Sequence, residues 1–339
     1  MPPKRQKVEG VKGELTWKVS TRKTEILGDL KELHERLSLV SQDPKDRPRD
    51  LKAIAAYLAS DRIISSTDKE VRLLAACCLV DVLRIFAPEA PYNDTELIKV
   101  FRVITAQLRG FASNDHDTFS GSKIFYILNS LSVVKSCVVL VFLAQTGNPE
   151  AEELYLSMFD AVVSSVRPDH SDEVTTHMAS IMQSCLEESE VIEQEVLETI
   201  LLPLLPPNKA ENSAAYNLCS NVLRRSFASI QESIAKLVND ILVGSLPRSE
   251  ISSSELADDI YAIVFELHRV SPNMLLTILP NVCLQLQVDD EGVRLKAVKL
   301  LGRLFSSQIA EYGIDFAKNF KDFLGRFHDV SVAVRHIAS

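Results

Sequence analysis

The sequence predicts an all-α protein, an α-solenoid built from successive pairs of helices. From about residue 24 onward the chain repeats one pattern, in which an apolar helix, a short polar turn and a second apolar helix follow one another. Glycine is scarce, with 11 in 339 residues, whereas hairpin turns and phosphate-binding loops depend on it. No segment shows sustained alternation of apolar and polar residues between hairpin turns, so we expect no strands.

The helices follow in order along the chain. The first begins near residue 24 and carries Ile26, Leu27, Leu30, Leu33, Leu37 and Val40 at helical spacing. The polar segment SQDPKDRPR at 41–49 ends it. We then expect about seven helix pairs within 24–339: 50–62 with 69–86, 95–112 with 122–144, 150–166 with 172–187, 191–204 with 211–225, 227–245 with 253–270, 273–287 with 290–307, and an incomplete pair of 313–327 with 331 onward.

A short motif opens several second helices and identifies the kind of repeat. It reads DKEVR at 68–72, DEGVR at 290–294 and DVSVAVR at 329–335. The acidic residue suits a helix N-cap, the valine faces the core, and the arginine is placed to reach an acidic neighbour in the adjoining repeat. The spacing from Arg294 to Arg335 falls within the period of about 40–47 residues of HEAT and armadillo repeats. The expected fold is therefore a HEAT-repeat, armadillo-like superhelix.

Charge and cysteine usage limit the function. The net charge of −9 argues against direct DNA binding as the main activity and leaves room for basic peptide partners. The six cysteines all lie in apolar helical runs and form no CxxC pair, so we expect buried free thiols in a reducing compartment. The longest apolar run, 137–144, is too short to span a bilayer. We expect a soluble intracellular protein that does not bind membranes.

Residues 1–23 are expected to form a flexible basic arm. This segment carries seven Lys and Arg against Glu9 and Glu14. The basic cluster at 3–7 is either a nuclear-import signal or a solvated tail. Trp17 is more consistent with docking of the arm on the first helix than with ligand binding.

Motifs for catalysis or metal binding are absent from the sequence. It contains neither GxxxxGK[ST] nor GxGxxG nor HExxH, and its seven histidines lack metal-ligand spacing. The acidic stretch at 114–117 lacks the alternation and terminal Glu of a calcium loop. We therefore expect no enzyme activity, no cofactor, no metal and no small-molecule substrate, and look instead for a binding surface.

The helix at 69–86 and the turn after it are the most informative stretch. Between 71 and 86 only Arg72, Asp81 and Arg84 are charged, which predicts an inner helix with protein on most sides, and a pair between Asp81 and Arg84 on a narrow face left to water. The turn that follows is Ala87, Pro88, Glu89, Ala90 and Pro91, which we expect to be stiff and extended. It is either a helix terminator with a linker or a preorganised ledge that receives a peptide.

A second candidate segment is FYILNSLSVVKS at 125–136, the expected neighbour of that turn. Tyr126, Asn129 and Lys135 are polar groups on an otherwise apolar helix. They fit two interpretations: either Tyr126 packs, Asn129 bonds to the backbone and Lys135 extends its ammonium to water, or Tyr126 and Lys135 belong to a binding site.

Both segments resemble one family. The stretch VRLLAACCLVDVLRIFAPEAPY at 71–92 resembles the signature of the precocious-dissociation-of-sisters family, the HEAT-repeat cofactors of cohesin. The segment at 125–136 resembles another stretch of that family, with the Asn displaced by one position, and LGRFHD at 324–329 resembles the start of a later repeat. The likeness runs from about residue 24 to the end of the sequence, and the basic arm has no clear counterpart.

The resemblance implies a non-catalytic nuclear scaffold that regulates how long cohesin stays on chromatin. It further implies that the N-terminal HEAT region binds short Tyr-Ser-Arg peptides of Wapl-like and sororin-like factors. Carried over to this sequence, the peptide site consists of Ala87, Pro88, Glu89, Ala90, Pro91 and Tyr92, with Glu89 as the carboxylate for the peptide arginine. Contacts with the kleisin subunit of cohesin are expected largely beyond residue 339.

Two alternatives remain at this point. One is a HEAT-repeat adaptor of another pathway, such as a nuclear transport receptor or a phosphatase scaffold, and the other is an enzyme regulator or a catalytic domain fused downstream. We also expect this sequence to be the N-terminal piece of a longer protein, because it stops about two turns into a helix of an unfinished pair.

Overall fold

The computed structural model describes residues 23–113, 118–244, 254–307, 309 and 312–338. The predicted basic arm lies outside these residues except for Lys23, and so does the acidic stretch at 114–117. Within the described residues all regular elements are helices, as the sequence predicts. The chain forms two compact units, Met1–Glu190 and Val191–Ser339, which we describe separately.

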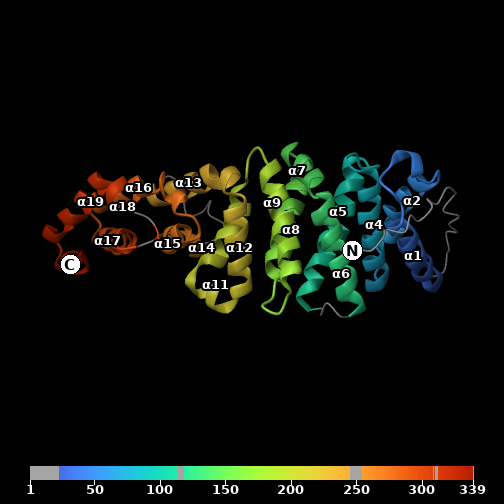
Figure 1. The fold of residues 1–339 in the computed structure, drawn as a ribbon, viewed down its shortest axis with the longest axis horizontal. Coiled ribbons are helices and arrows are strands. Elements are labelled where there is room, and N and C mark those ends of the chain that lie inside the picture. The colour runs from blue at the N-terminus through green and yellow to red at the C-terminus, as the bar shows by residue number, and fades with distance from the viewer. Residues whose placement is uncertain (1–22, 114–117, 245–253, 308, 310–311, 339) are drawn as a thin grey trace, which may run out of the picture. The chain divides into compact units, whose positions relative to one another are not determined.

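Unit 1 is a stack of helix pairs in two layers (Figure 1). One layer consists of α1 and the second helices of the pairs, and in it α1, α4, α6 and α9 contact one another in that order. The other layer consists of α3, α5 and α8. The helices are α1 (Lys23–Ser38), α2 (Leu51–Leu58), α3 (Asp61–Ile64), α4 (Lys69–Phe86), α5 (Asp94–Arg109), α6 (Phe119–Val134), α7 (Val138–Gln145), α8 (Pro149–Ser165) and α9 (Asp172–Glu188).

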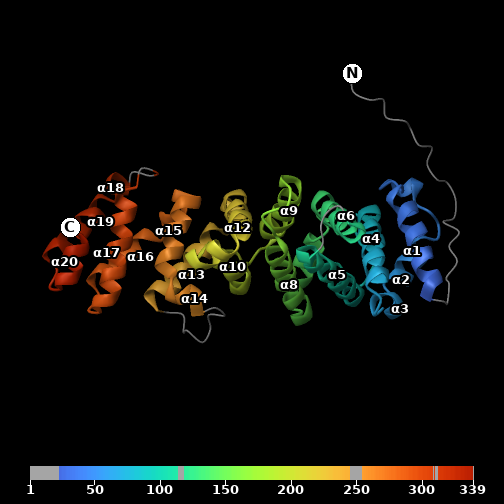
Figure 2. The same cartoon turned by 90° about the horizontal axis from the view of Figure 1, so that it is seen from below.

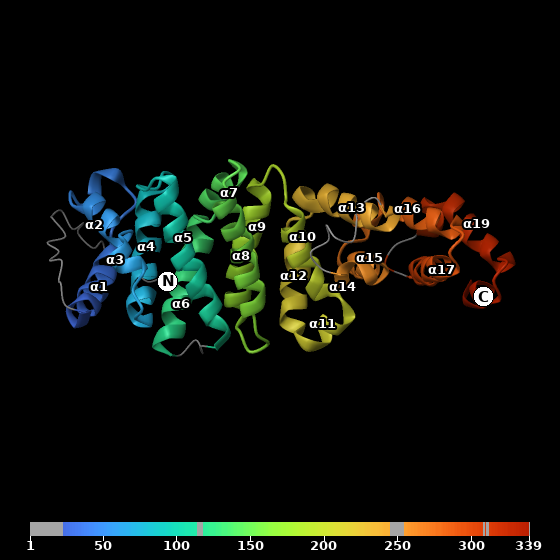
Figure 3. The ribbon, with the colours of Figure 1, turned by 180° about the vertical axis from the view of Figure 1, so that it is seen from behind.

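Unit 2 repeats the two-layer arrangement with shorter helices (Figures 2 and 3). Successive contacts join α12, α15, α17 and α20 in one layer and α10, α13, α16 and α19 in the other. The helices are α10 (Gln194–Leu201), α11 (Pro206–Glu211), α12 (Ser213–Arg225), α13 (Phe227–Val243), α14 (Ser254–Asp258), α15 (Ile260–Val270), α16 (Leu279–Leu284), α17 (Glu291–Phe305), α18 (Tyr312–Asp315), α19 (Ala317–Leu324) and α20 (Val332–Ala338).

The first helices of unit 2 are more broken than predicted. The expected helix at 191–204 is α10 followed by a 3₁₀ turn at Leu202–Leu204, and the expected helix at 273–287 is α16 between 3₁₀ turns at Pro272–Leu275 and Gln285–Gln287. Pro203 and Pro272 lie in two of these turns. Proline lacks the N–H that a continuous helix needs, which accounts for the interruptions at these two positions.

Helix α4 is the inner helix of unit 1, as its composition predicts. Fourteen of its 18 residues are buried, since α1, α2, α5 and α6 all contact it. Asp68 caps its N-terminus by accepting from the amides of Glu70 and Val71, which satisfies two amides that have no partner within the helix. The predicted pair of Asp81 and Arg84 exists, but it does not face water, because Asp81 is fully buried.

The predicted single helix at 122–144 is in fact two helices. α6 ends at Val134, and its C-cap Lys135 adopts the left-handed conformation with φ 56° and ψ 30°. α7 then continues at an angle of 70° to α6. Lys135 and Ser136 are the only polar residues between the apolar stretches 133–134 and 137–144, and so short an interruption does not by itself predict a break in a helix. Within the described residues no single helix has the length and apolarity to cross a membrane, and only α6 and α7 taken together, across their bend, do.

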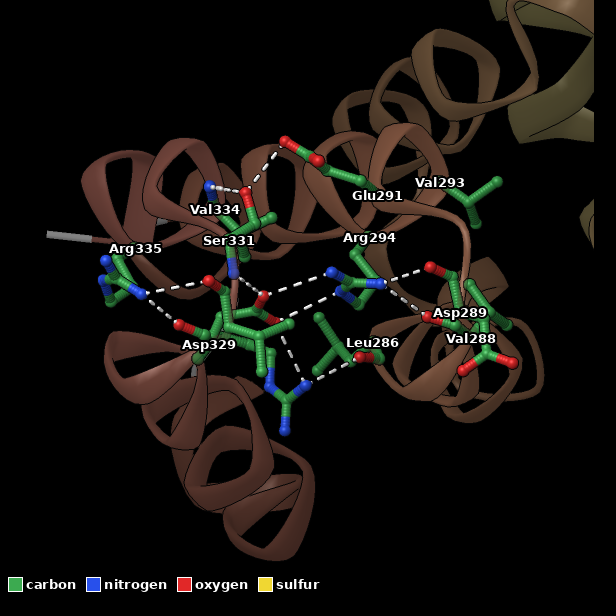
Figure 4. Close-up of polar contacts among 12 residues, drawn as sticks. Leu286, Val288, Asp289, Glu291, Val293, Arg294, Asp329, Ser331, Val334 and Arg335 are labelled. Atoms are coloured by element: carbon green, nitrogen blue, oxygen red, sulfur yellow. Dashed lines mark hydrogen bonds and ion pairs between the residues drawn. The ribbon is translucent and has the colours of Figure 1, made fainter.

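The arginines of the repeat motif share one contact. Arg72, Arg294 and Arg335 each donate from Nη1 to the carbonyl oxygen six residues earlier, at 2.6, 2.9 and 2.6 Å. Arg294 also forms the predicted pair with the adjoining repeat, in which its Nε and Nη2 each lie 3.2 Å from an oxygen of Asp329 (Figure 4). The motif therefore closes the turn within a repeat and, at Arg294, joins two repeats.

The cysteines are free and buried, as expected from their positions in apolar helical runs. Burial raises the pKa of Cys77 to about 12, so this thiol stays protonated at neutral pH. Among the residues that the structure describes, no group of three or more His, Cys, Asp or Glu side chains has the geometry of a metal site.

Candidate peptide-binding site

The candidate site begins at the turn of residues 87–91, which lies between two well-capped helices. The Ala87–Pro88 peptide bond is cis, and the Glu89 amide donates to the carbonyl of Phe86 over 3.1 Å. The bond from Glu89 to Phe86 closes the start of the segment into a turn, so the segment is less extended than the sequence predicts. Asn93 then starts α5 with a capping box, in which it exchanges bonds of 3.0 and 2.9 Å with Glu96. These bonds hold the turn at both ends.

A pocket of about 450 Å³ lies beside this turn, and we call it the turn pocket. Its volume falls in the range of about 300–1,000 Å³ that is typical of ligand sites, and its walls are mainly apolar. The pocket is lined by Leu83, Ala87, Pro88, Ala90, Leu97, Val134, Lys135, Ser136, Val138, Val139, Phe142 and Glu188.

The break at Lys135 builds the second wall of the turn pocket. Because the chain turns by 70° there, α7 brings Val138, Val139 and Phe142 to the side opposite the 87–91 turn. The Lys135 carbonyl accepts from the Val138 amide over 3.1 Å and starts α7. Phe142 is 57% exposed, so an aromatic ring stands at the pocket with much of its surface open to solvent.

Two charged side chains accompany the apolar walls of the turn pocket. Lys135 and Glu188 both line it and are both exposed. The pocket can therefore hold an apolar or aromatic group while offering a cation and a carboxylate to polar atoms of the same ligand. Nothing in this arrangement resembles a nucleophile with an adjacent base.

The structure brings only part of the predicted site together. Ala87, Pro88, Ala90 and Lys135 line the turn pocket. Glu89 is exposed on the turn next to these residues but is not part of the pocket wall. Pro91 is half-buried, also outside the wall, and Tyr92 is 9% exposed, so its ring is not available to a ligand.

Tyr126 occupies a different place from the one expected of a contact residue. Its hydroxyl donates to Asp81 over 2.7 Å. The same carboxylate lies 3.2 Å from Nδ1 of His34 and 3.2 Å from Nη2 of Arg84. Burial, and then the charge of Asp81, raise the pKa of Tyr126, so the phenol keeps its proton. Tyr126 thus joins α6 to α4 and positions the helix that ends at the turn pocket.

Sequence reasoning missed most of the apolar wall. Leu83, Leu97, Val138, Val139 and Phe142 all read as ordinary core residues in the sequence, and Glu188 reads as a helix-terminal charge. Phe142 is the only one of these residues whose exposure in the structure points to a binding role. That exposure cannot be read from the sequence. The position of α7 depends on the left-handed backbone conformation of Lys135. Lysine rarely adopts this conformation, so the sequence does not predict it.

The sequence matches one protein family over most of its length. A family model described as "Sister chromatid cohesion protein PDS5 protein" matches residues 24–338. The chain is 33% identical over 327 residues to the human Sister chromatid cohesion protein PDS5 homolog A, which covers 96% of this chain and 23% of that protein. It is 32% identical over 327 residues to PDS5 homolog B-B of Xenopus laevis, covering 96% of this chain and 21% of that protein.

A solved structure supports the fold. A chain described under "Structure of the Pds5-Scc1 complex and implications for cohesin function" aligns with a TM-score of 0.76 at 21% identity, covering 98% of this chain and 51% of that chain. The predicted solenoid is thereby confirmed. Since the match to the family model extends over almost all of the described residues, the resemblance noted at 71–92 is confirmed as well, and the chain belongs to the PDS5 family of sister chromatid cohesion proteins.

Proposed function

We propose that this chain belongs to a non-catalytic scaffold that regulates the hold of cohesin on chromatin, and that its turn pocket binds a short peptide of the Tyr-Ser-Arg type. The chain spans about a quarter of the length of its curated relatives, and the peptide-binding proposal concerns this part of the family alone. The partners proposed for it are Wapl-like and sororin-like factors, with the cohesin kleisin bound elsewhere, in the nucleus.

The observation that carries this proposal is the apolar pocket against a preorganised turn. A tyrosine ring fits walls made by Leu83, Val138 and Phe142, while the turn of residues 87–91 presents a backbone that is already ordered. Little conformational entropy remains to be lost on that side when a peptide binds.

The charges suit an arginine next to the tyrosine. Glu89 is exposed on the turn and carries the carboxylate proposed for the peptide arginine, a charge-assisted pair that has room to become bidentate. Glu188 offers a second carboxylate in the pocket wall, and Lys135 is placed to bond a peptide carbonyl or hydroxyl oxygen. The peptide would therefore have its ring in the pocket and its guanidinium above the turn.

The family supplies the biological setting of the proposal. Its members named above are called sister chromatid cohesion proteins, and the solved relative was determined with Scc1. A transport receptor or a phosphatase scaffold gains no support from these matches. We therefore favour a role in cohesin regulation over a role as a HEAT-repeat adaptor of another pathway.

The test is calorimetric titration of the 339-residue chain with the peptide Lys-Thr-Tyr-Ser-Arg. We expect a micromolar dissociation constant, about −8 kcal/mol, and loss of binding in Glu89→Lys. Glu153→Lys is the matched control, because Glu153 is an equally exposed carboxylate on α8. Absence of binding by a folded wild-type chain, or equal losses in the two variants, would contradict the proposed site.

A further inference from the structure

A second surface of the molecule, in unit 2, is strongly basic. Helices α12, α15 and α17, neighbours in one layer (Figure 2), carry seven Arg and Lys and only two Glu. In the opposite layer, α10, α13, α16 and α19 together carry five acidic residues and three lysines. The charge of unit 2 is therefore segregated between its two layers, although the whole chain has a net charge of −9.

Three cations of this layer lie on one face of α17. Lys296, Lys299 and Arg303 follow the i, i+3, i+7 spacing of a single helix face on α17, and all three are exposed. The Arg303 guanidinium lies 3.5 Å from the ring centroid of Phe265 on α15, which links the α17 stripe to the next helix. We call Arg224, Arg269, Lys296, Lys299 and Arg303 the basic face.

One buried carboxylate holds Arg269 of the basic face and the neighbouring Lys209. Glu266 is 6% exposed and accepts from the hydroxyl of Tyr216 at 2.9 Å and from Arg269 at 3.0 Å. Lys209 lies 3.6 Å from the same carboxylate and 3.7 Å from the Tyr216 ring centroid. Arg269 and Lys209 are thus held in place before any ligand arrives.

Most cations of the basic face form no ion pair with a carboxylate that the structure describes. Lys296, Lys299 and Arg303 form no ion pair with any residue that the structure describes, and Glu266 is already shared between Arg269 and Lys209. Like charges on neighbouring helices repel, so a bound anionic partner would relieve this repulsion. The surface is therefore complementary to a ligand carrying several negative charges.

We propose that the basic face binds an extended acidic peptide segment of a partner protein, running across α12, α15 and α17. Packed helices lie about 8–10 Å apart, and an extended chain advances about 3.3 Å per residue. About three residues of peptide then separate one helix from the next, so an acidic residue recurring every three positions meets a cation on each helix. Charge-assisted bonds to exposed Arg and Lys supply the recognition.

The observations favour a peptide over a nucleic acid. The two rings of this surface, Tyr216 and Phe265, are already covered by Lys209 and Arg303, so they are not free to stack on bases. The net charge of −9 opposes the approach of a long polyanion, whereas a short acidic segment experiences mainly the local field of the face.

The test is fluorescence anisotropy of a labelled 12-residue peptide of Glu-Glu-Ser repeats with the full 339-residue chain in 50 mM salt. We expect saturable binding that weakens at least tenfold in the double variant Lys296→Gln, Lys299→Gln and is abolished when Gln replaces Glu in the peptide. Lys236→Gln with Lys318→Gln is the control, because it removes the same charge from exposed positions of the opposite layer. That pair should change affinity less than twofold.

Three results would overturn the proposal. They are no saturation by the acidic peptide at 200 µM, equal weakening in the two double variants, and a 12-nucleotide single strand that binds more tightly and loses affinity in the Lys296 and Lys299 variant. Thermal melting of each variant confirms that the chain is folded before binding is compared. The experiment does not involve the turn pocket, so it succeeds or fails independently of the Tyr-Ser-Arg proposal.

Discussion

Tyr126 and Asp81, which are 45 residues apart in sequence, are joined by a 2.7 Å hydrogen bond from the phenol of α6 to the carboxylate of α4. His34 of α1 contacts the other oxygen of the same carboxylate. Asp81 is fully buried, so these partners and Arg84 supply the hydrogen bonds that water cannot. The cluster therefore fixes the spacing of three neighbouring helices and, through α6, the position of the turn pocket.

Removing the phenol hydroxyl tests this link. Tyr126→Phe should lower the free energy of unfolding by about 2 kcal/mol, because a hydrogen bond to a buried charge contributes about 1.5–3 kcal/mol. Urea denaturation measures the change. Tyr261→Phe removes a phenol hydroxyl for which the structure gives no hydrogen bond, and it should cost less than about 0.5 kcal/mol. Equal effects of the two substitutions would rule out a special role of the Asp81 bond.

The break between α6 and α7 makes a prediction about backbone conformation. Lys135 has φ 56°, a region that costs a residue with a Cβ about 1–2 kcal/mol and costs glycine almost nothing. Lys135→Gly should therefore be more stable than Lys135→Ala by about 1 kcal/mol in urea denaturation. Both variants lack the ammonium group, so the comparison isolates the backbone. A more stable alanine variant would be inconsistent with a left-handed residue at this position.

The exposed ring of α7 makes a prediction about binding. Phe142→Ala should weaken binding of the Lys-Thr-Tyr-Ser-Arg peptide about tenfold, since loss of an aromatic contact in a pocket typically costs more than 1 kcal/mol. The melting temperature should hardly change, because the ring is 57% exposed. Phe327→Ala, at a ring 40% exposed in unit 2, serves as the control and should leave peptide affinity unaltered. The titration calorimetry described above measures both.

Asp329 makes a prediction about pH. Burial raises the pKa of Asp329, but hydrogen bonds from the Ser331 amide and from Arg294 lower this pKa by more than burial raises it. The pKa of Asp329 is therefore lower than the usual value of 3.8. A pKa depressed in the folded state means that the carboxylate stabilises the fold at neutral pH and that this contribution is lost as pH falls below about 4. Asp329→Asn should cost about 3 kcal/mol at pH 7, because it breaks a buried pair.

The same comparison at low pH completes this test. The difference between wild type and Asp329→Asn should shrink as the pH is lowered from 5 to 3, as followed by urea denaturation at each pH. Asp94→Asn, at an exposed carboxylate in the first turn of α5, should show only a small difference throughout. If the penalty of Asp329→Asn does not depend on pH, the carboxylate charge is not what stabilises this junction.

The fold was predictable because its signals are local and repeated. The caps at Asp68 and Asp290, the apolar length of α4 and the spacing of the motif arginines all depend on residues close together in the chain. The family resemblance at 71–92 added the identity of the repeat array and the position of the turn.

The site was predictable only in part, because its second wall depends on geometry that sequence patterns do not carry. Lys135 and Ser136 are the only polar residues within 133–141, too short an interruption for the hydrophobic pattern to separate α6 from α7. The sequence also left open whether Tyr126 packs or belongs to a binding site, and it gives no sign of the carboxylate 45 residues away that holds its hydroxyl. Long-range pairing of this kind lies outside what spacing along one helix can reveal.

The contact shared by Arg72, Arg294 and Arg335 sets a length constraint on the chain. In each case the guanidinium reaches the carbonyl six residues earlier, so the number of residues between that carbonyl and the arginine cannot vary without breaking the bond. One inserted residue would shift the carbonyl by about 3.3 Å, more than a hydrogen bond tolerates. Insertions and deletions in relatives should therefore avoid these three turns and accumulate in connections without such an arginine.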